Sequence, residues 1–266
     1  MPKIQVNDIE VNYEVHGNGF PLILLAGFAC ELHFWDERMV RELGEKFQTI
    51  LVDNRGAGLT DGSKGPYSIK QFANDTAGLM DALEIPTAYI LGHSLGGMIA
   101  QQLAIDFAGR VAKLILCSTT CGGSKSIPMG PELAPRFQER VQGKLSLEGN
   151  LDLKVDSCFT EEFQQANPEF IAEFREINAN IVMPRKTLVK QAIALMAFNS
   201  ARFLKKLDIP TLILHGQKDR LIPPENAEIM AQYISGAKVV YLGESAHALY
   251  TPEPEAFMNA LLEFLT

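Results

Sequence analysis

The sequence lacks the cysteine and histidine patterns of a disulfide framework or a zinc site. Its 266 residues include four cysteines with no C-x-x-C pair, and five histidines with no H-x-x-x-H or H-x-x-E-H spacing. A chain of this length can bury a sizeable core, so we expect the four thiols to be free and buried. We expect no metal ion and no other cofactor, because no ligand set occurs at a metal-binding spacing.

The sequence also lacks an excess of positive charge and a long apolar run. Lys and Arg number 24 against 32 Asp and Glu, a formal net charge of −8, which argues against a nucleic-acid partner. The longest apolar run, Pro21–Cys30, is about half the length of a membrane-spanning helix, so we expect no membrane partner. The first ten residues carry no apolar signal stretch, which predicts a cytoplasmic location.

Short runs rich in Ile, Leu and Val alternate with helical patterns along most of the chain. Helical patterns occupy residues 69–83 and 97–107, and a last helix is expected to begin with Thr251 as its N-cap and Pro252 at its first position. This alternation predicts an α/β protein with a mostly parallel, doubly wound sheet. The expected strands are residues 3–6, 10–15, 22–26, 49–52, 88–91, 114–117, 211–214 and 239–242.

The alternation breaks in the middle of the chain. Between residues 124 and 205 strand-like runs disappear and helical patterns take their place, and strand-like chain resumes at Thr211. An inserted helical cap over the carboxyl ends of the strands fits this pattern better than a separate domain. We therefore predict a core of residues 1–123 and 206–266, with residues 124–205 as the cap insertion.

A G-x-S-x-G motif follows the expected strand 88–91. In Gly92-His93-Ser94-Leu95-Gly96 the serine lies between a strand and a helix, so the turn is sharp and needs small neighbours. The turn projects the Ser94 hydroxyl into the site and directs the backbone N–H of Leu95 at any oxyanion formed there. The N-terminus of the following helix adds positive potential. We interpret Ser94 as a nucleophile.

This motif and its context resemble the α/β-hydrolase superfamily over essentially the whole chain. The resemblance is to its small capped esterases, its lactonases, 3-oxoadipate enol-lactonases among them, and its cofactor-free haloperoxidases. It implies a triad in the order serine, acid, histidine, with the last two on late loops. Segment 211–219 ends in the strand-then-G-x-x-D pattern of the acid, and Gly-Glu-Ser-Ala-His at 243–247 resembles the histidine loop. The resemblance therefore assigns Asp219 as the acid and His247 as the base.

The same resemblance implies a second oxyanion donor in the loop after the first parallel strand, usually written H-G-x. Ala26-Gly27-Phe28 matches that loop, so the backbone N–H of Phe28 joins that of Leu95 as the expected oxyanion hole. Alanine in place of the usual histidine is a departure, which leaves the loop conformation and the subfamily open.

Three other polar positions receive structural interpretations. The segment that begins at Asp53 resembles the D-x-R-G-x-G loop of the superfamily, and we expect Arg55 to brace neighbouring backbone. His93 is expected to pack or to contact substrate, because adjacent residues on a turn point apart. His215 ends a buried strand and is expected to be a core histidine with a satisfied ring.

Together these assignments predict a serine hydrolase that cleaves a small carboxylic ester or lactone through an acyl-enzyme. Hydrolysis of a carbon–carbon bond in a ring-cleavage product uses the same three residues and stays open. A non-catalytic small-ligand receptor on the same fold is the other alternative. Residues 124–205 hold 11 Lys and Arg against 10 Asp and Glu, which predicts neutral substrates unless an arginine such as Arg185 or Arg202 faces the pocket.

Overall fold

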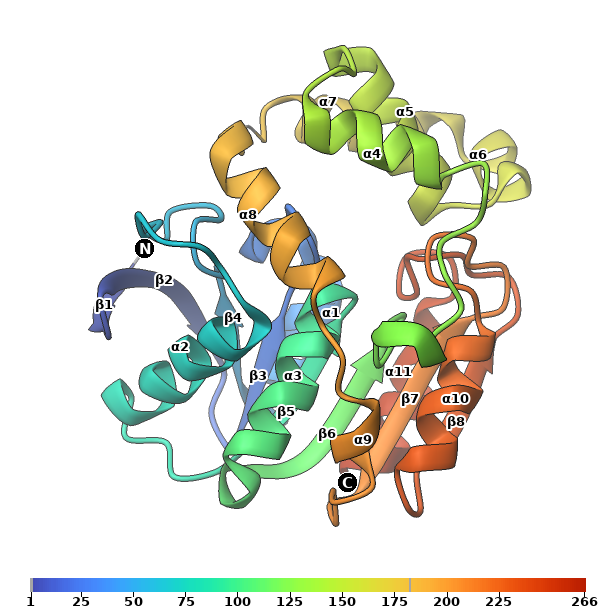
Figure 1. The fold of residues 1–266 in the computed structure, drawn as a ribbon. Coiled ribbons are helices and arrows are strands. Elements are labelled where there is room, and N and C mark those ends of the chain that lie inside the picture. The colour runs from blue at the N-terminus through green and yellow to red at the C-terminus, as the bar shows by residue number, and fades with distance from the viewer. Residues whose placement is uncertain (1, 182) are drawn as a thin grey trace.

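Eight strands form one sheet in the computed structural model, which describes residues 2–181 and 183–266 (Figure 1). Their order is β1-β2-β4-β3-β5-β6-β7-β8, with β1 and β2 antiparallel to their neighbours and all other pairs parallel. The prediction of a mostly parallel sheet is confirmed. The strands are β1 (Lys3–Val6), β2 (Ile9–His16), β3 (Phe20–Leu25), β4 (Phe47–Val52), β5 (Ala88–His93), β6 (Val111–Cys117), β7 (Thr211–Gly216) and β8 (Lys238–Leu242).

Helices cover both faces of this sheet, as a doubly wound topology requires (Figure 1). Within the described ranges, every helix is too short or too polar to cross a membrane. The α-helices are α1 (Glu37–Gly44), α2 (Ile69–Ala82), α3 (Leu95–Asp106), α4 (Ala134–Gln142), α5 (Leu147–Cys158), α6 (Glu161–Ala166), α7 (Pro168–Ala179), α8 (Arg185–Met196), α9 (Ala201–Leu204), α10 (Glu225–Tyr233) and α11 (Pro254–Leu265). Three short 3₁₀ helices occupy Leu32–Phe34, Ala108–Arg110 and Gly123–Lys125.

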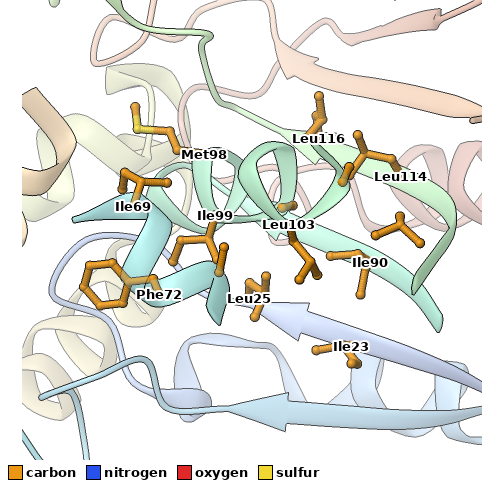
Figure 2. Packing of buried hydrophobic residues seen from close by; sticks show 14 of the residues in the cluster. Ile23, Leu25, Ile69, Phe72, Ile90, Met98, Ile99, Leu103, Leu114 and Leu116 are labelled. Carbon is orange, nitrogen blue, oxygen red and sulfur yellow. The ribbon is translucent and has the colours of Figure 1, made fainter. Parts of the chain in front are cut away.

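The central strands β3 to β7 are apolar along most of their length because both of their faces are buried. On one face Ile23 and Ile90 of the sheet pack against Ile99 and Leu103 of α3, and all four are fully buried (Figure 2). On the other face α1 and α11 cover Leu24 and its neighbours. Each fully buried Ile or Leu side chain contributes ~1.5–3 kcal/mol to stability. This packing holds the carboxyl ends of the strands at one rigid edge.

The last helix begins later than the sequence predicts. Its first residue is Pro254 and its N-cap is Glu253, so the expected cap at Thr251 and first position at Pro252 are wrong. Proline disfavours helical backbone in the residue before it. A helix begun at Pro252 would place Glu253 in that helical region directly before Pro254, whereas Glu253 has φ −137° and ψ 62°.

The chain between β6 and β7 is helical and lies above the carboxyl ends of the strands (Figure 1). We call residues 124–181 and 183–205 the helical segment. The chain leaves the sheet and returns to it at one place, because β6 and β7 are adjacent strands. There, an antiparallel bridge joins Gly122 to Asn199, and the Ser200 N–H donates to the Cys121 carbonyl oxygen at 2.9 Å.

Candidate active site

Ser94 is the single residue between strand β5 and helix α3. Its backbone has φ 56° and ψ −117°, a left-handed conformation that is rare for a residue with a side chain. Two hydrogen bonds hold this turn. The Ser94 N–H donates to the Cys117 carbonyl oxygen at 2.9 Å, and Thr119 Oγ1 donates to the Ser94 carbonyl oxygen at 2.7 Å. The motif therefore forms the strained strand-to-helix turn that its sequence predicts.

The two glycines of the motif allow backbone segments to touch. A Cβ added to Gly96 would lie 1.9 Å from the Leu25 carbonyl oxygen, and one added to Gly92 would lie 2.3 Å from the Gly96 carbonyl oxygen. Both contacts are with backbone atoms, so neither can be relieved by turning a side chain. Strand β3 and the loop after it can thus pack directly against the start of α3.

Asp219 and His247 form a buried hydrogen-bonded pair. His247 Nδ1 lies 2.8 Å from Asp219 Oδ2, and the other oxygen, Oδ1, accepts the N–H groups of Leu221 and Ile222 at 2.9 Å each. Burial alone would raise the pKa of Asp219, but the attraction of His247 and the hydrogen bonds from His215 and His247 hold this pKa below its ordinary value. The carboxylate is therefore charged and accepts a hydrogen bond from Nδ1 of His247. This arrangement leaves Nε2 of His247 free to accept a proton.

Ser94 and His247 line the same cavity, which has a volume of about 1100 Å³. Among the described residues, Ser94 Oγ and His247 Nε2 do not reach hydrogen-bonding geometry. In enzymes this bond is often long until substrate binds. The structure thus brings the three predicted residues to one place, with one of the two triad hydrogen bonds formed.

The two expected oxyanion donors belong to segments next to Ser94. Phe28 follows Gly27, where an added Cβ would lie 3.3 Å from Ser94 Cβ, and Leu95 follows Ser94 directly. Phe28 lines the cavity, and Leu95 is the first residue of α3 and is buried. Within the described ranges, the backbone N–H groups of both residues lack a protein acceptor. The Phe28 loop is held from behind, because Asn54 Nδ2 donates to the Ala26 carbonyl oxygen at 2.9 Å. Alanine at position 26 therefore leaves the loop anchored through its backbone.

His93 packs beside the site and also supports its histidine. Its ring stacks at 4.8 Å from that of Phe34 and lies edge-on to the His247 ring at 4.7 Å, which agrees with the packing interpretation. Its Nε2 also hydrogen-bonds the backbone carbonyl oxygen of His247, a contact that the sequence analysis missed. Burial, with the like charge of His247, lowers the pKa of His93 to about 3, so its ring is neutral.

His215 is a buried core histidine as predicted, and it also contacts Asp219. The expectation that its ring is fully satisfied is wrong, because within the described residues the buried Nδ1 has no hydrogen-bond partner. Its side chain is fully buried, with Nε2 2.9 Å from the Ile222 carbonyl oxygen and 3.5 Å from Asp219 Oδ2. A buried imidazole behind the carboxylate thus limits how far Asp219 can move.

Arg55 does not brace backbone, so that expectation is wrong. It forms ion pairs with Asp75 on α2, at 2.6 Å from Nη2, and with Asp8 in the β1–β2 turn, at 2.7 Å. Burial alone would lower the pKa of Arg55, but the hydrogen bonds that its guanidinium donates to Asp75 and Asp8 outweigh this effect and raise that pKa. Asp53 provides the backbone contacts, accepting the Leu32 N–H at 2.7 Å.

The helical segment hydrogen-bonds two loops of the site. The carbonyl oxygens of Ser157 and Cys158, at the end of α5, accept the N–H groups of His247 at 3.4 Å and Ala248 at 3.1 Å. Gln191 Oε1 of α8 accepts the Ala29 N–H at 3.0 Å, next to the Phe28 loop. The segment also supplies much of the apolar wall of the cavity, including Met129, Phe137, Phe159, Phe170, Phe174, Met196 and Phe198.

The four cysteines are free, as predicted. Cys117 and Cys121 are buried, whereas Cys30 and Cys158 are half-buried and line the cavity. Across residues 2–181 and 183–266, no group of three or more His, Cys, Asp or Glu side chains could hold a metal ion.

A comparison with known protein families matches residues 21–254 to the α/β hydrolase fold. The chain belongs to the α/β hydrolase fold family. The resemblance seen in the sequence is confirmed, and the match spans both the serine turn and the loops of Asp219 and His247.

Other members of the α/β hydrolase fold family match this chain from end to end. The putative carbamate hydrolase RutD of Azorhizobium caulinodans is 27% identical and covers 99% of this chain and 98% of its own length. The enol-lactonase of Burkholderia xenovorans LB400 superposes with a TM-score of 0.86 at 27% identity, covering 99% of each chain. A thermophilic esterase from Thermogutta terrifontis reaches 0.84 at 28% identity, covering 99% of this chain and 97% of its own.

Proposed function

We propose that this α/β hydrolase is a serine hydrolase that cleaves small carboxylic esters or lactones through an acyl-enzyme on Ser94. The observation that carries the proposal is the 2.8 Å bond between Asp219 and His247 beside the strained Ser94 turn, in one cavity. Esterase and lactonase are also names borne by relatives that match its full length.

Acylation uses each of these groups once. Asp219 accepts the Nδ1 proton of His247 in a hydrogen bond, so Nε2 takes the Ser94 proton as Oγ attacks the substrate carbonyl. The carbonyl oxygen becomes an oxyanion and accepts the N–H groups of Phe28 and Leu95. Each such donor contributes ~10²–10³ in rate. The protonated His247 then gives its proton to the leaving alkoxide as the carbon–oxygen bond breaks.

Deacylation repeats the cycle with water. Nε2 of His247 takes a proton from water as its oxygen attacks the acyl carbon, and the second oxyanion occupies the same hole. When the bond to Ser94 Oγ breaks, His247 returns the proton to that oxygen. The acid product leaves, and every proton and electron pair is accounted for by the chain and water.

We further propose that residues 124–205 act as a cap that selects the substrate. The support is the hydrogen bonding of the helical segment to the His247 loop and to Ala29, and its large share of the cavity wall. Replacing a wall residue such as Met196 should therefore change chain-length preference while Ser94 stays reactive toward a small fluorophosphonate.

The decisive experiment combines labelling with turnover. A fluorophosphonate probe should label the wild type and should not label Ser94→Ala, which should lose about 10⁶ in rate with its fold intact. Asp219→Asn should lose ~10⁴, because the His247 tautomer is no longer fixed. The matched control is Ser126→Ala, since Ser126 lines the same cavity but lies outside the turn; it should keep both label and activity.

The substrate panel separates this proposal from its rivals. It contains p-nitrophenyl esters, lactones, a carbamate and a vinylogous diketone, all of which present a carbonyl to the nucleophile. Preference for the diketone would replace ester hydrolysis by carbon–carbon bond hydrolysis. Tight binding with no turnover of any compound would show a receptor, and equal labelling of Ser94→Ala would refute the nucleophile.

A further inference from the structure

Two cationic side chains from the helical segment line the cavity that holds Ser94. They are Arg140 of α4 and Lys154 of α5. Their neighbour Arg136, one turn earlier on α4, instead pairs with Asp156 at 2.7 Å and lies outside the cavity lining. The segment thus uses one of these arginines for an ion pair and presents the other to the cavity.

Arg140 lies against aromatic and thiol groups. Its guanidinium carbon is 5.7 Å from the centre of the Phe28 ring, which itself packs on Phe137 at 5.2 Å. Burial lowers the pKa of Arg140, and only the Cys30 and Cys158 thiols oppose that effect. A guanidinium keeps its charge at neutral pH in such surroundings. Within the described ranges no acceptor binds the side-chain N–H groups of Arg140, so they are available to a ligand.

The carboxylates of the cavity wall do not neutralise these two cations. Glu31 and Asp36 also line the cavity, but within the described ranges neither comes within 4 Å of Arg140 or Lys154. Asp36 instead caps α1, where its side chain accepts the Arg38 N–H at 2.8 Å.

The amine of Lys154 donates to Asn178 Oδ1, a neutral partner that also lines the cavity. Asn178 carries no charge, so this hydrogen bond does not neutralise the lysine next to the cavity. Within the described ranges, the two half-buried cations of this largely apolar cavity have no anionic partner. The cavity is therefore suited to an anion from outside the chain, because a partly buried charge is stabilised most by an opposite charge.

We infer that Arg140 binds a carboxylate carried by the acyl part of the substrate, with Lys154 as a second positive charge. This inference rests on the proposed ester or lactone hydrolysis and names its substrate class: esters or lactones that bear a carboxylate on the acyl chain. A guanidinium holds a carboxylate through two parallel N–H···O bonds. Since Arg140 lies over Phe28, such a bond also orients the scissile carbonyl toward the Phe28 N–H.

The positions of the charged side chains in the helical segment say more about the substrate than the net charge of that segment. The near balance of residues 124–205 predicts neutral substrates, with Arg185 or Arg202 as the candidate exceptions. The structure directs the Arg185 guanidinium to the Gln142 carbonyl oxygen and the Arg202 guanidinium over the Phe203 ring, and neither residue lines the cavity. Among the described residues, Arg140 is the arginine that lines the cavity with Ser94, although the count treats it like any other cation.

The test compares two esters that differ by one carboxylate, p-nitrophenyl butyrate and mono-p-nitrophenyl glutarate. Arg140→Gln should lower kcat/KM for the glutarate ester ~10–100-fold more than for the butyrate ester. Arg140→Lys should fall between, because a lysine keeps the charge and loses the paired geometry. Arg136→Gln, the matched control, should leave the ratio of the two substrates at the wild-type value.

A binding measurement keeps this inference separate from the hydrolysis it rests on. Glutarate itself, titrated calorimetrically into Ser94→Ala, should bind at least ~10-fold more weakly when Arg140 is also replaced by Gln. Equal losses for both esters in Arg140→Gln, or glutarate binding that ignores this change, would overturn the inference. Hydrolysis of neither ester, with Arg140-dependent glutarate binding intact, would refute the proposed reaction and leave the anion site standing.

Discussion

His93 Nε2 lies 2.9 Å from the backbone carbonyl oxygen of His247, so the residue before Ser94 anchors the main chain of the histidine proposed as its base. A carbonyl oxygen only accepts, so Nε2 of His93 must carry the proton. The serine turn and the late histidine loop, 154 residues apart, are tied by this one bond.

Replacing His93 should therefore act through His247. His93→Leu removes the donor and should lower kcat by about 10², because small misplacements of a catalytic group cost that much, with little change in KM. His93→Gln offers an amide N–H at a similar reach and should recover much of the loss. The rate of fluorophosphonate labelling of Ser94 checks this, and a Leu variant with wild-type labelling would contradict it.

Acid should destabilise the fold through the same residue. The pKa of His93 is about 3 in the native state against 6.5 ordinarily, so the unfolded chain binds a proton first as pH falls. Stability from this group is complete above pH 6.5 and declines between pH 6.5 and 3, by up to about 1.4 kcal/mol per pH unit. Urea unfolding at several pH values should show a shallower decline in His93→Gln; identical slopes would argue against a neutral buried ring.

Gly96→Ala should disrupt the site and the fold together. The added Cβ would meet the Leu25 carbonyl oxygen at 1.9 Å, so β3 or α3 must move, with an expected cost of ~1–3 kcal/mol or more. Gly109→Ala is the matched control, since nothing lies within 4 Å of its Cβ. Thermal unfolding should separate the two variants, and a Gly96→Ala protein as stable as wild type would show that the backbone adapts.

The ion pair of Arg55 with Asp75 should contribute more to the free energy of unfolding than its ion pair with Asp8. The side chains of Arg55 and Asp75 are 1% and 9% exposed, whereas that of Asp8 is 58% exposed. Asp75→Asn leaves a buried guanidinium short of its main partner and should cost ~3–5 kcal/mol. Asp8→Asn breaks a largely exposed pair and should cost less than ~1 kcal/mol. Chemical unfolding of both variants tests this order, and equal losses would contradict it.

Strands β3 to β7 were predictable because most of their residues are buried on both faces of the sheet. Such burial requires short runs rich in Ile, Leu and Val. All eight predicted strands are present, most of them longer than predicted. The short helices α4 and α6 were not predicted from the sequence. Helices α4 and α6 span nine and six residues and bury none of them completely, so each is too short to show a repeating apolar pattern.

The site residues likewise fall into those that the sequence predicts and those that it does not. Ser94, Asp219 and His247 lie in contiguous motifs whose spacing reflects local backbone geometry, so the sequence reveals them. The contact of Gln191 with Ala29 and the direction of Arg140 depend on how distant helices settle over the sheet. No local sequence pattern encodes such a contact. The count of charges over residues 124–205 likewise does not distinguish Arg140, which lines the cavity, from the other cations.

The bridge between Gly122 and Asn199 brings the two ends of the helical segment together, so that the segment can be exchanged as a unit with that of another protein. The chain leaves the sheet after β6 and returns to it at β7, the adjacent strand. A segment grafted from another α/β hydrolase therefore has only to match the short distance between these two strands. The graft must also bring backbone carbonyls that receive the His247 and Ala248 amides, and an acceptor for the Ala29 amide. Under the proposed roles of residues 124–205 and Ser94, a chimera that satisfies these few contacts should take the donor's choice of substrate and keep the Ser94 chemistry of this chain. Substrate choice would then move with the grafted segment, while the reaction stays with the sheet and its loops.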